Sequence, residues 1–195
     1  MAPKKPSRMR GEDRREQILD VTHAIVDAEG FHAATPNRIA EAAGVTRPVL
    51  YQQFGDLPGL FVALIDREAE RAALQFAEAL TTAPGADPFD AAFTGSLAAI
   101  DAHPATWRLF LVPPQGAPPA LHERLAIAQD QVRAFLAAEL RRTLPDAPDP
   151  DYSARILHAA GQTLLQQRLI DPEHATSERL TALVRRLRDW IRPPE

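Results

Sequence analysis

Apolar residues recur every three or four positions along most of the chain, which is the spacing of one face of an α-helix. Alternating runs of Val, Ile and Thr, which indicate strands, are nearly absent. The pattern therefore predicts an all-α protein. The expected helices cover residues 12–29, 36–43, 46–54, 56–80, 88–101, 104–111, 121–140, 152–170 and 177–191.

The expected helix ends coincide with residues that cap helices or break them. Gly30 follows the first helix where a left-handed C-terminal cap is needed, and Thr35 precedes Pro36 as an N-cap. Asp87 is expected to cap the helix that begins at Pro88. Breaks that contain Pro or Gly separate the longer helices at 81–87, 112–119 and 144–150.

The segment Thr35–Phe54, TPNRIAEAAGVTRPVLYQQF, has the pattern of a helix-turn-helix. Leu50 and Phe54, four positions apart, turn the apolar side of the second helix inward. The residues left outward include no carboxylate, and Gln and Arg side chains can read bases in the major groove of DNA. The outward residues are Arg47, Pro48, Tyr51, Gln52 and Gln53. From spacing alone, an ordinary hairpin of two helices with a polar face remains the alternative.

The stretch Ile18–Leu64 resembles the N-terminal domain of the TetR family of bacterial transcription regulators. The matching positions are Gly30-Phe31, Thr35, Ile39-Ala40, Ala43-Gly44-Val45, Leu50-Tyr51, Phe54 and Leu60. The resemblance implies a three-helix helix-turn-helix DNA-binding domain, followed by a larger helical domain for effector binding and dimerisation. It also implies a homodimer, usually a repressor, that binds a pseudo-palindromic DNA operator and is released by a small-molecule effector.

The resemblance also implies roles for individual residues. Thr35 is expected at a phosphate, Thr46 and Arg47 at phosphates or bases, and Gln52 at a base. Tyr51 and Gln53 are expected to anchor the DNA backbone.

Two residues depart from the family pattern. The family usually has a small residue at the position of Pro48, which disfavours α geometry at Arg47, so the second helix is expected to begin one residue late. The family commonly has Lys at the position of Leu57, so one phosphate anchor is missing. Free amides at the helix N-terminus after Asp56 are expected to replace it.

The expected domains are a basic flexible arm at 1–11, the DNA-binding domain at 12–56 and the ligand-binding and dimerisation domain at 57–195. The net charge is -4, yet residues 1–55 hold eight Lys and Arg against seven Asp and Glu. The surplus lies in the arm, which contains Lys4, Lys5, Arg8 and Arg10. Such an arm suits DNA, and a solvated tail is the alternative.

Aromatic residues are concentrated in two consecutive helices, at Phe89, Phe93, Trp107 and Phe110, and His158 and Gln162 offer polar groups one turn apart on a later helix. Apolar walls with few polar groups are typical of ligand sites, although each aromatic by itself also fits a core. We expect these six residues to bind a neutral, hydrophobic effector. Arg108 keeps an anionic effector as the alternative. The helix 58–80 is expected to couple this site to the DNA-binding domain.

Homodimerisation is expected through about 152–170 and 177–191. The second of these helices carries an apolar stripe, and Gly161 in the first is expected to permit a close helix crossing. Packing of the stripe inside one monomer is the alternative. The stripe consists of Leu180, Leu183, Val184, Leu187, Trp190 and Ile191.

The sequence contains no cysteine, no nucleotide-binding or nucleophile motif and only scattered histidines. We therefore expect no catalytic residue, no metal and no cofactor. No apolar run is long enough to cross a membrane, which predicts a cytoplasmic protein. The alternative function is a helical protein-interaction module with weakened or lost DNA binding, which the departures at Pro48 and Leu57 would permit.

Overall fold

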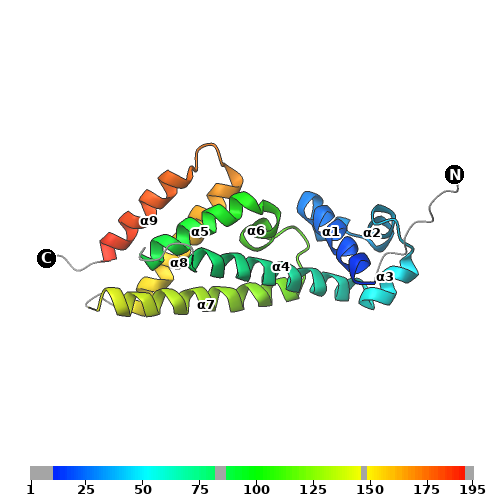
Figure 1. Cartoon of the computed structure of the whole chain (residues 1–195), viewed down its shortest axis with the longest axis horizontal. Helices are drawn as coiled ribbons and strands as arrows, with labels where there is room; N and C mark the ends of the chain where they lie inside the picture. The colour runs from blue at the N-terminus through cyan, green and yellow to red at the C-terminus, as the bar shows by residue number, and fades with distance from the viewer. Residues whose placement is uncertain (1–10, 82–86, 146–148, 192–195) are drawn as a thin grey trace, which may run out of the picture. The chain divides into compact units, whose positions relative to one another are not determined.

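The computed structural model describes residues 11–81, 87–145 and 149–191. Within these ranges the chain is helical without strands, which confirms the all-α prediction (Figure 1). The predicted arm lies outside the described residues except for Gly11, which begins the first helix. The elements are α1 (Gly11–Glu29), the 3-10 helix η1 (Phe31–Ala33), α2 (Pro36–Ala42), α3 (Arg47–Phe54), α4 (Leu57–Thr81), α5 (Pro88–Ala102), α6 (Pro104–Leu111), α7 (Pro119–Thr143), α8 (Pro150–Ile170) and α9 (Ser177–Ile191).

The chain packs into two compact units. The described part of the first unit comprises residues 11–66 together with 114–118, and the second comprises the described residues among 67–113 and 119–195. Helix α4 begins in the first unit and continues into the second, so this division falls inside a continuous helix. The expected boundary between the DNA-binding domain and the ligand-binding domain, at 56–57, lies at the start of α4 and stays a prediction.

The core of the first unit is built from one apolar side of each of its helices, as the periodicity predicts. The rings of Phe31 and Phe61 contact each other edge to face, with their centroids 5.0 Å apart. Apolar side chains at helical spacing bury one stripe and leave the other side of each helix to solvent. The fully buried members of this core include Ile18, Leu19, Val26, Ile39, Leu50, Leu60, Leu64 and Ile65.

The turn between α2 and α3 forms as the sequence predicts. Thr35 caps α2, and its Oγ1 accepts a hydrogen bond from the backbone N–H of Arg38 at 3.4 Å. Gly44 follows α2 with φ at 63°, a left-handed conformation that favours glycine. The backbone N–H of Val45 then donates to the carbonyl of Ala40 at 2.9 Å, which closes the turn.

In the second unit, α5 packs against α8 and α9, and α7 packs along α8. Asp87 caps α5 as predicted, because its carboxylate accepts hydrogen bonds from the backbone N–H groups of Phe89 and Asp90, at 3.0 and 3.3 Å. Helix α7 extends beyond the predicted 121–140 at both ends. These helices bury two clusters of apolar side chains, one around Phe89 and Leu140 and one around Phe93 and Leu97.

A buried carboxylate joins α4 to α6 inside the second unit. Glu68 is fully buried, and its Oε2 accepts a hydrogen bond from the Thr106 hydroxyl at 2.5 Å. Its Oε1 lies 2.9 Å from Arg67 Nη2 and 3.0 Å from Arg71 Nη1. A buried charge is tolerated only when it is paired and hydrogen-bonded, and Glu68 meets both conditions.

Candidate functional site

Helix α3 presents the residues that the sequence analysis assigned to DNA. Leu50 is fully buried and fixes the orientation of the helix. The outward side of α3 contains no acidic side chain, so nothing on it repels a phosphate. Of the predicted DNA contacts, Thr35, Thr46, Arg47, Pro48, Tyr51 and Gln52 are exposed and Gln53 is half-buried.

Two arginines beside this surface are held in different ways. Arg47 Nη1 donates to the amide oxygen of Asn37 at 3.0 Å, and a neutral partner leaves the charge of Arg47 uncompensated. Arg38 forms a two-pronged ion pair with Glu29 at the end of α1. The hydrogen bond from Arg38 lowers the pKa of Glu29 below its ordinary value, so this carboxylate stays charged and compensates Arg38.

Helix α3 begins at Arg47, one residue after the start of the expected range 46–54, and Pro48 lies in its first turn. Thr46 takes the extended conformation of an N-cap residue, although its side chain makes no capping hydrogen bond. Proline is tolerated here because the N–H groups of a first turn have no partner within the helix. Arg47 is therefore the first residue of the helix.

The other end of α3 is held by Arg15 of α1. The Arg15 guanidinium donates to the Gln53 carbonyl at 2.9 Å and lies 4.4 Å from the centroid of the Phe54 ring. A cation at a helix C-terminus stabilises carbonyls that lack partners within the helix. Arg15 therefore positions the C-terminal end of α3.

The start of α4 offers fewer free amides than the sequence analysis expects. Asp56 Oδ1 accepts a hydrogen bond from the Gly59 N–H at 2.7 Å, so that amide is already engaged. Leu57, the residue at the position of the family's Lys, is half-buried. A phosphate at this helix N-terminus would have to use the remaining amides.

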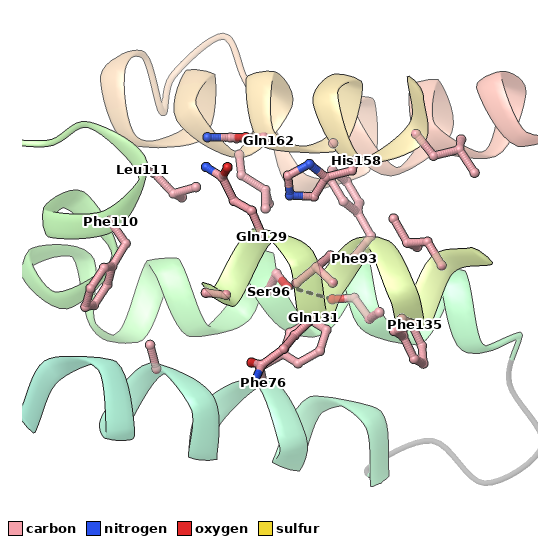
Figure 2. A pocket seen from close by; sticks show the side chains of 18 of the residues that line it. Phe76, Phe93, Ser96, Phe110, Leu111, Gln129, Gln131, Phe135, His158 and Gln162 are labelled. Atoms are coloured by element: carbon pink, nitrogen blue, oxygen red, sulfur yellow. Dashed lines mark hydrogen bonds between the residues drawn. The ribbon is translucent and has the colours of Figure 1, made fainter. Parts of the chain in front are cut away.

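A cavity of about 600 Å³ lies within the second unit, lined by side chains from α4 to α9 (Figure 2). This volume is in the range of pockets that hold drug-sized ligands. All six residues predicted for the effector line it: Phe89, Phe93, Trp107, Phe110, His158 and Gln162. Arg108, which the sequence analysis left open as an anion partner, is not among the lining residues.

Several lining residues could not be singled out from the sequence. Phe76 of α4 and Phe135 of α7 face each other edge to face, with ring centroids 6.3 Å apart. Gln129 of α7 contributes an amide to the wall. Three residues of α4 contribute only methyl groups: Ala69, Ala72 and Ala73. The apolar ones follow the ordinary spacing of their helices and Gln129 resembles any surface glutamine, so no signal sets these residues apart.

Gly161 also lines the cavity, and a Cβ built on it would meet nothing within 4 Å. The sequence analysis assigned this glycine to a close crossing between helices. Within one chain the missing side chain leaves space beside the cavity, and the predicted crossing in the dimer stays a prediction.

Helix α9 divides its apolar stripe between the interior and the surface. Leu180 and Ile191 are buried, whereas Leu183 is 44% exposed and Trp190 is 76% exposed. On α8, Tyr152 and other apolar residues are likewise exposed, among them Ile156 and Ile170. The two helices predicted to form the dimer interface therefore both carry uncovered apolar side chains.

Neither a metal centre nor a membrane-spanning helix is found in the part of the chain that the structure describes. No group of three or more His, Asp or Glu side chains there is placed to hold a metal ion. No described helix is both long and apolar enough to cross a membrane.

Comparisons with known proteins agree with this arrangement. A family model for bacterial regulatory proteins of the tetR family matches residues 18–64. The HTH-type transcriptional regulator BetI of Serratia proteamaculans is 31% identical over 145 residues, which cover 69% of this chain and 70% of BetI. The HTH-type transcriptional activator FasR of Mycolicibacterium smegmatis is 34% identical over 76 residues, covering 39% of this chain. The match spans 35% of the length of FasR.

A solved structure has the same fold. The crystal structure of a TetR-like transcriptional regulator from Rhodococcus sp. RHA1 aligns with a TM-score of 0.76 at 24% identity, covering 92% of this chain and 96% of that one. The family model matches the segment that contains the helix-turn-helix, and the relationship to BetI extends over most of the chain. The chain therefore belongs to the TetR family of bacterial regulatory proteins.

Proposed function

We propose that this protein is a homodimeric, cytoplasmic transcription repressor that binds a pseudo-palindromic operator and is released from it by a small, mostly hydrophobic ligand. The exposed face of α3 carries the proposal for DNA. A short helix with Arg47, Tyr51 and Gln52 outward and no carboxylate fits the major groove, where Gln can read adenine.

The proposed roles divide the contacts into two classes. Gln52 reads a base, whereas Thr35, Tyr51 and Gln53 hold the DNA backbone, and Thr46, Arg47 and Pro48 lie against phosphates or bases at the start of α3. Contacts to phosphate add affinity for every sequence, and contacts to base edges distinguish sequences. Substitutions in the two classes therefore have different consequences.

Fluorescence anisotropy with the DNA upstream of the protein's own gene tests this assignment. Gln52→Ala should lose about 1–3 kcal/mol of discrimination at one base pair of each half-site and leave the other positions unchanged. Tyr51→Phe is the matched control and should weaken binding to all variants of the site alike. If Gln52→Ala distinguishes the variants as the parent does, Gln52 does not read a base. Failure of the parent to bind any DNA would favour the protein-interaction module.

The proposed dimer uses the exposed apolar side chains of α8 and α9. Leu183→Asp and Trp190→Asp should convert a dimer into a folded monomer, because both positions are exposed within one chain. Leu74→Asp is the control, since Leu74 is 65% exposed but lies on α4. Light scattering should give twice the chain mass for the parent and for Leu74→Asp. A dimer that survives both α9 substitutions would contradict this interface.

The proposed coupling follows the continuity of the chain. Helix α4 runs from Leu57, beside the helix-turn-helix in sequence, to the cavity wall at Ala69 and Phe76. A ligand lowers DNA affinity by its difference in affinity between the DNA-competent and the released arrangements. Because FasR is by name an activator, the sign of regulation is measured separately, by transcription from the upstream promoter with and without the protein.

A further inference from the structure

Three uncharged polar side chains of the cavity wall lie close together in sequence or space on α7 and α8. His158 and Gln162 are one turn apart on α8, and Figure 2 shows the amide of Gln129 directed from α7 toward α8. All three side chains are half-buried, and none forms a hydrogen bond with another described residue. Amides can both donate and accept hydrogen bonds, and so can a neutral imidazole through its two nitrogens. This part of the wall is therefore a set of unused, uncharged hydrogen-bonding groups.

The rest of the cavity wall is mostly aromatic and aliphatic, and the hydroxyl of Ser96, a further polar lining residue, already donates to the Ala92 carbonyl at 2.8 Å. Phe76, Phe93, Phe110 and Phe135 line it, and their rings have no hydrogen-bonding group. The indole N–H of Trp107 is already donated to Gln75 Oε1 at 2.8 Å, so Trp107 offers only its ring. An apolar ligand body gains by leaving water for such walls.

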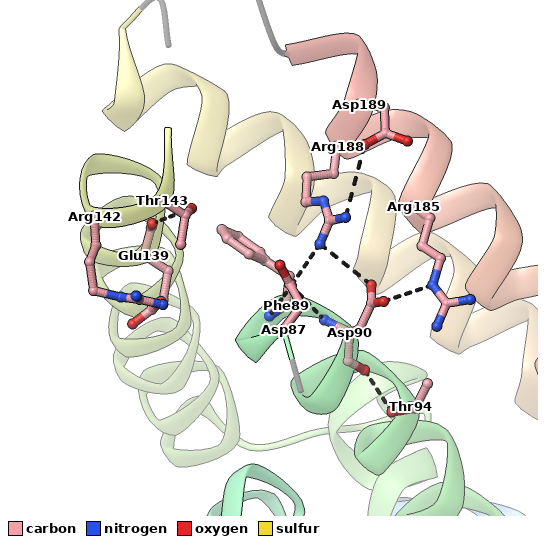
Figure 3. A network of polar contacts seen from close by, with 10 residues as sticks. All are labelled: Asp87, Phe89, Asp90, Thr94, Glu139, Arg142, Thr143, Arg185, Arg188 and Asp189. Atoms are coloured by element: carbon pink, nitrogen blue, oxygen red, sulfur yellow. Dashed lines mark hydrogen bonds and ion pairs between the residues drawn. The ribbon is translucent and has the colours of Figure 1, made fainter. Parts of the chain in front are cut away.

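The charged side chains that line the cavity are already engaged with other residues of the chain. The described lining of the cavity includes no Asp or Glu that could compensate a cation. Arg188, which lines one end, is already paired: its Nη1 lies 2.6 Å from Asp87 Oδ1 and 3.7 Å from Asp90 Oδ1 (Figure 3). Arg124, the other basic lining residue, is exposed and forms another interaction within the chain. A carboxylate placed in the cavity would lose its hydration without gaining a free cation.

The imidazole of His158 does not supply a charge either. Burial lowers the pKa of His158 below its ordinary value, and the nearby Arg133 lowers it further. Near neutral pH the ring is therefore uncharged, with one nitrogen that donates and one that accepts.

We propose that the cavity selects an uncharged amphipathic ligand, with an apolar body among the phenylalanine rings and one hydroxyl- or carbonyl-type head against Gln129, His158 and Gln162. This inference rests on the proposed effector site and specifies its ligand class. The head needs to be neutral because the cavity lacks a free counter-charge, and it needs to be polar because otherwise the buried amides lose water without replacement.

Isothermal titration calorimetry of the full chain, without DNA, tests the proposal. The probes are 1-decanol, decanoate and decylammonium at about pH 7.5, where the last two are charged and all three contain ten carbon atoms. We expect 1-decanol to bind at least about tenfold more tightly than either ion, since desolvation of an unpaired charge opposes binding. Gln162→Leu and His158→Leu should each weaken 1-decanol by about 3–10-fold, the effect of losing a hydrogen bond.

Gln131→Leu is the matched control, because Gln131 also lines the cavity but is solvent-exposed. It should leave the preference for 1-decanol unchanged. Thermal unfolding of each variant identifies any loss of folding, and Gln162→Asn then replaces Gln162→Leu as the smaller change. Equal or tighter binding of decanoate or decylammonium overturns the proposal, and so does no measurable binding of 1-decanol. Because DNA is absent, this result is independent of whether the protein binds an operator.

Discussion

The backbone N–H of Phe31 donates to the carbonyl of Gln115 at 2.9 Å. This bond joins η1 to residues 114–118, the segment between α6 and α7 that packs with the first unit. Gly30 precedes Phe31 with φ at 90° and ψ at 170°, a conformation that is essentially confined to glycine. A Cβ on Gly30 would also lie 2.9 Å from the same Gln115 oxygen. Glycine is therefore required here for its backbone angles and for space.

Gly30→Ala should destabilise the protein more than Gly44→Ala. Both positions have positive φ, but a Cβ on Gly44 would meet nothing within 4 Å. We expect a cost of about 1–2 kcal/mol for Gly44→Ala, from the left-handed backbone alone, and a larger cost for Gly30→Ala. Urea unfolding measures both. Equal losses would mean that the contact with Gln115 contributes nothing.

Arg47→Ala should weaken DNA binding more than Arg38→Ala. Arg38 is compensated by Glu29, whereas Arg47 is hydrogen-bonded to the neutral Asn37. If Arg47 contacts a phosphate, its loss should reduce the slope of log affinity against log salt by about 0.9. Arg38→Ala is the control, with a smaller expected change. A slope that is identical in the parent and in Arg47→Ala excludes a phosphate contact at that residue.

Thr106→Val should reduce the free energy of unfolding by about 1.5–3 kcal/mol, because it removes a hydrogen bond to the buried Glu68 carboxylate. Valine keeps the shape of the side chain, so little else changes. Thr94→Val is the control: the Thr94 hydroxyl is exposed and bonds to a carbonyl of its own helix. A cost for Thr106→Val within about 0.5 kcal/mol of the cost for Thr94→Val would contradict a structural role for this bond.

The depressed pKa of His158 predicts a pH dependence of stability. Between the lowered pKa of the folded state and the ordinary value of 6.5, the unfolded chain binds more protons than the folded one. Stability should therefore be fully present above about pH 6.5 and should decrease as the pH falls toward the folded-state pKa. His158→Gln should lessen this decrease, as measured by urea unfolding across that range. The same decrease in both proteins would assign it to other groups.

Much of the fold can be predicted because its signals are local. Thr35 and Asp87 precede prolines as N-caps, and Gly30 and Gly44 mark positions that need a positive φ. Each of these features depends on neighbours within four residues, and the helical periodicity depends on the same short range. The end of α3 is different, because Arg15 reaches it from 38 positions away.

The candidate site can be predicted only in part for the same reason. Phe93 and Trp107 belong to a local concentration of aromatic residues, and His158 lies one helical turn from another polar residue. Both patterns are visible in the sequence, and all three residues line the cavity. Gly161 carries no local sign that it faces the cavity, because a helical glycine equally suits a close crossing. Thr106 and Glu68 are 38 positions apart in the sequence, and only the packing of α4 against α6 brings them into contact.

The central claim, that ligand binding in the cavity controls DNA binding, is tested most directly by a side chain that blocks the place of the ligand. Gly161→Leu adds bulk where a Cβ meets nothing within 4 Å, so the variant should fold. The measurement is the affinity for the gene's upstream DNA, by fluorescence anisotropy, with and without 1-decanol. We expect 1-decanol to weaken DNA binding by the parent and by the exposed-site control Ala138→Leu, and Gly161→Leu to bind DNA without responding to 1-decanol. A Gly161→Leu protein that releases DNA as readily as the parent, or a parent that ignores 1-decanol, would contradict the account.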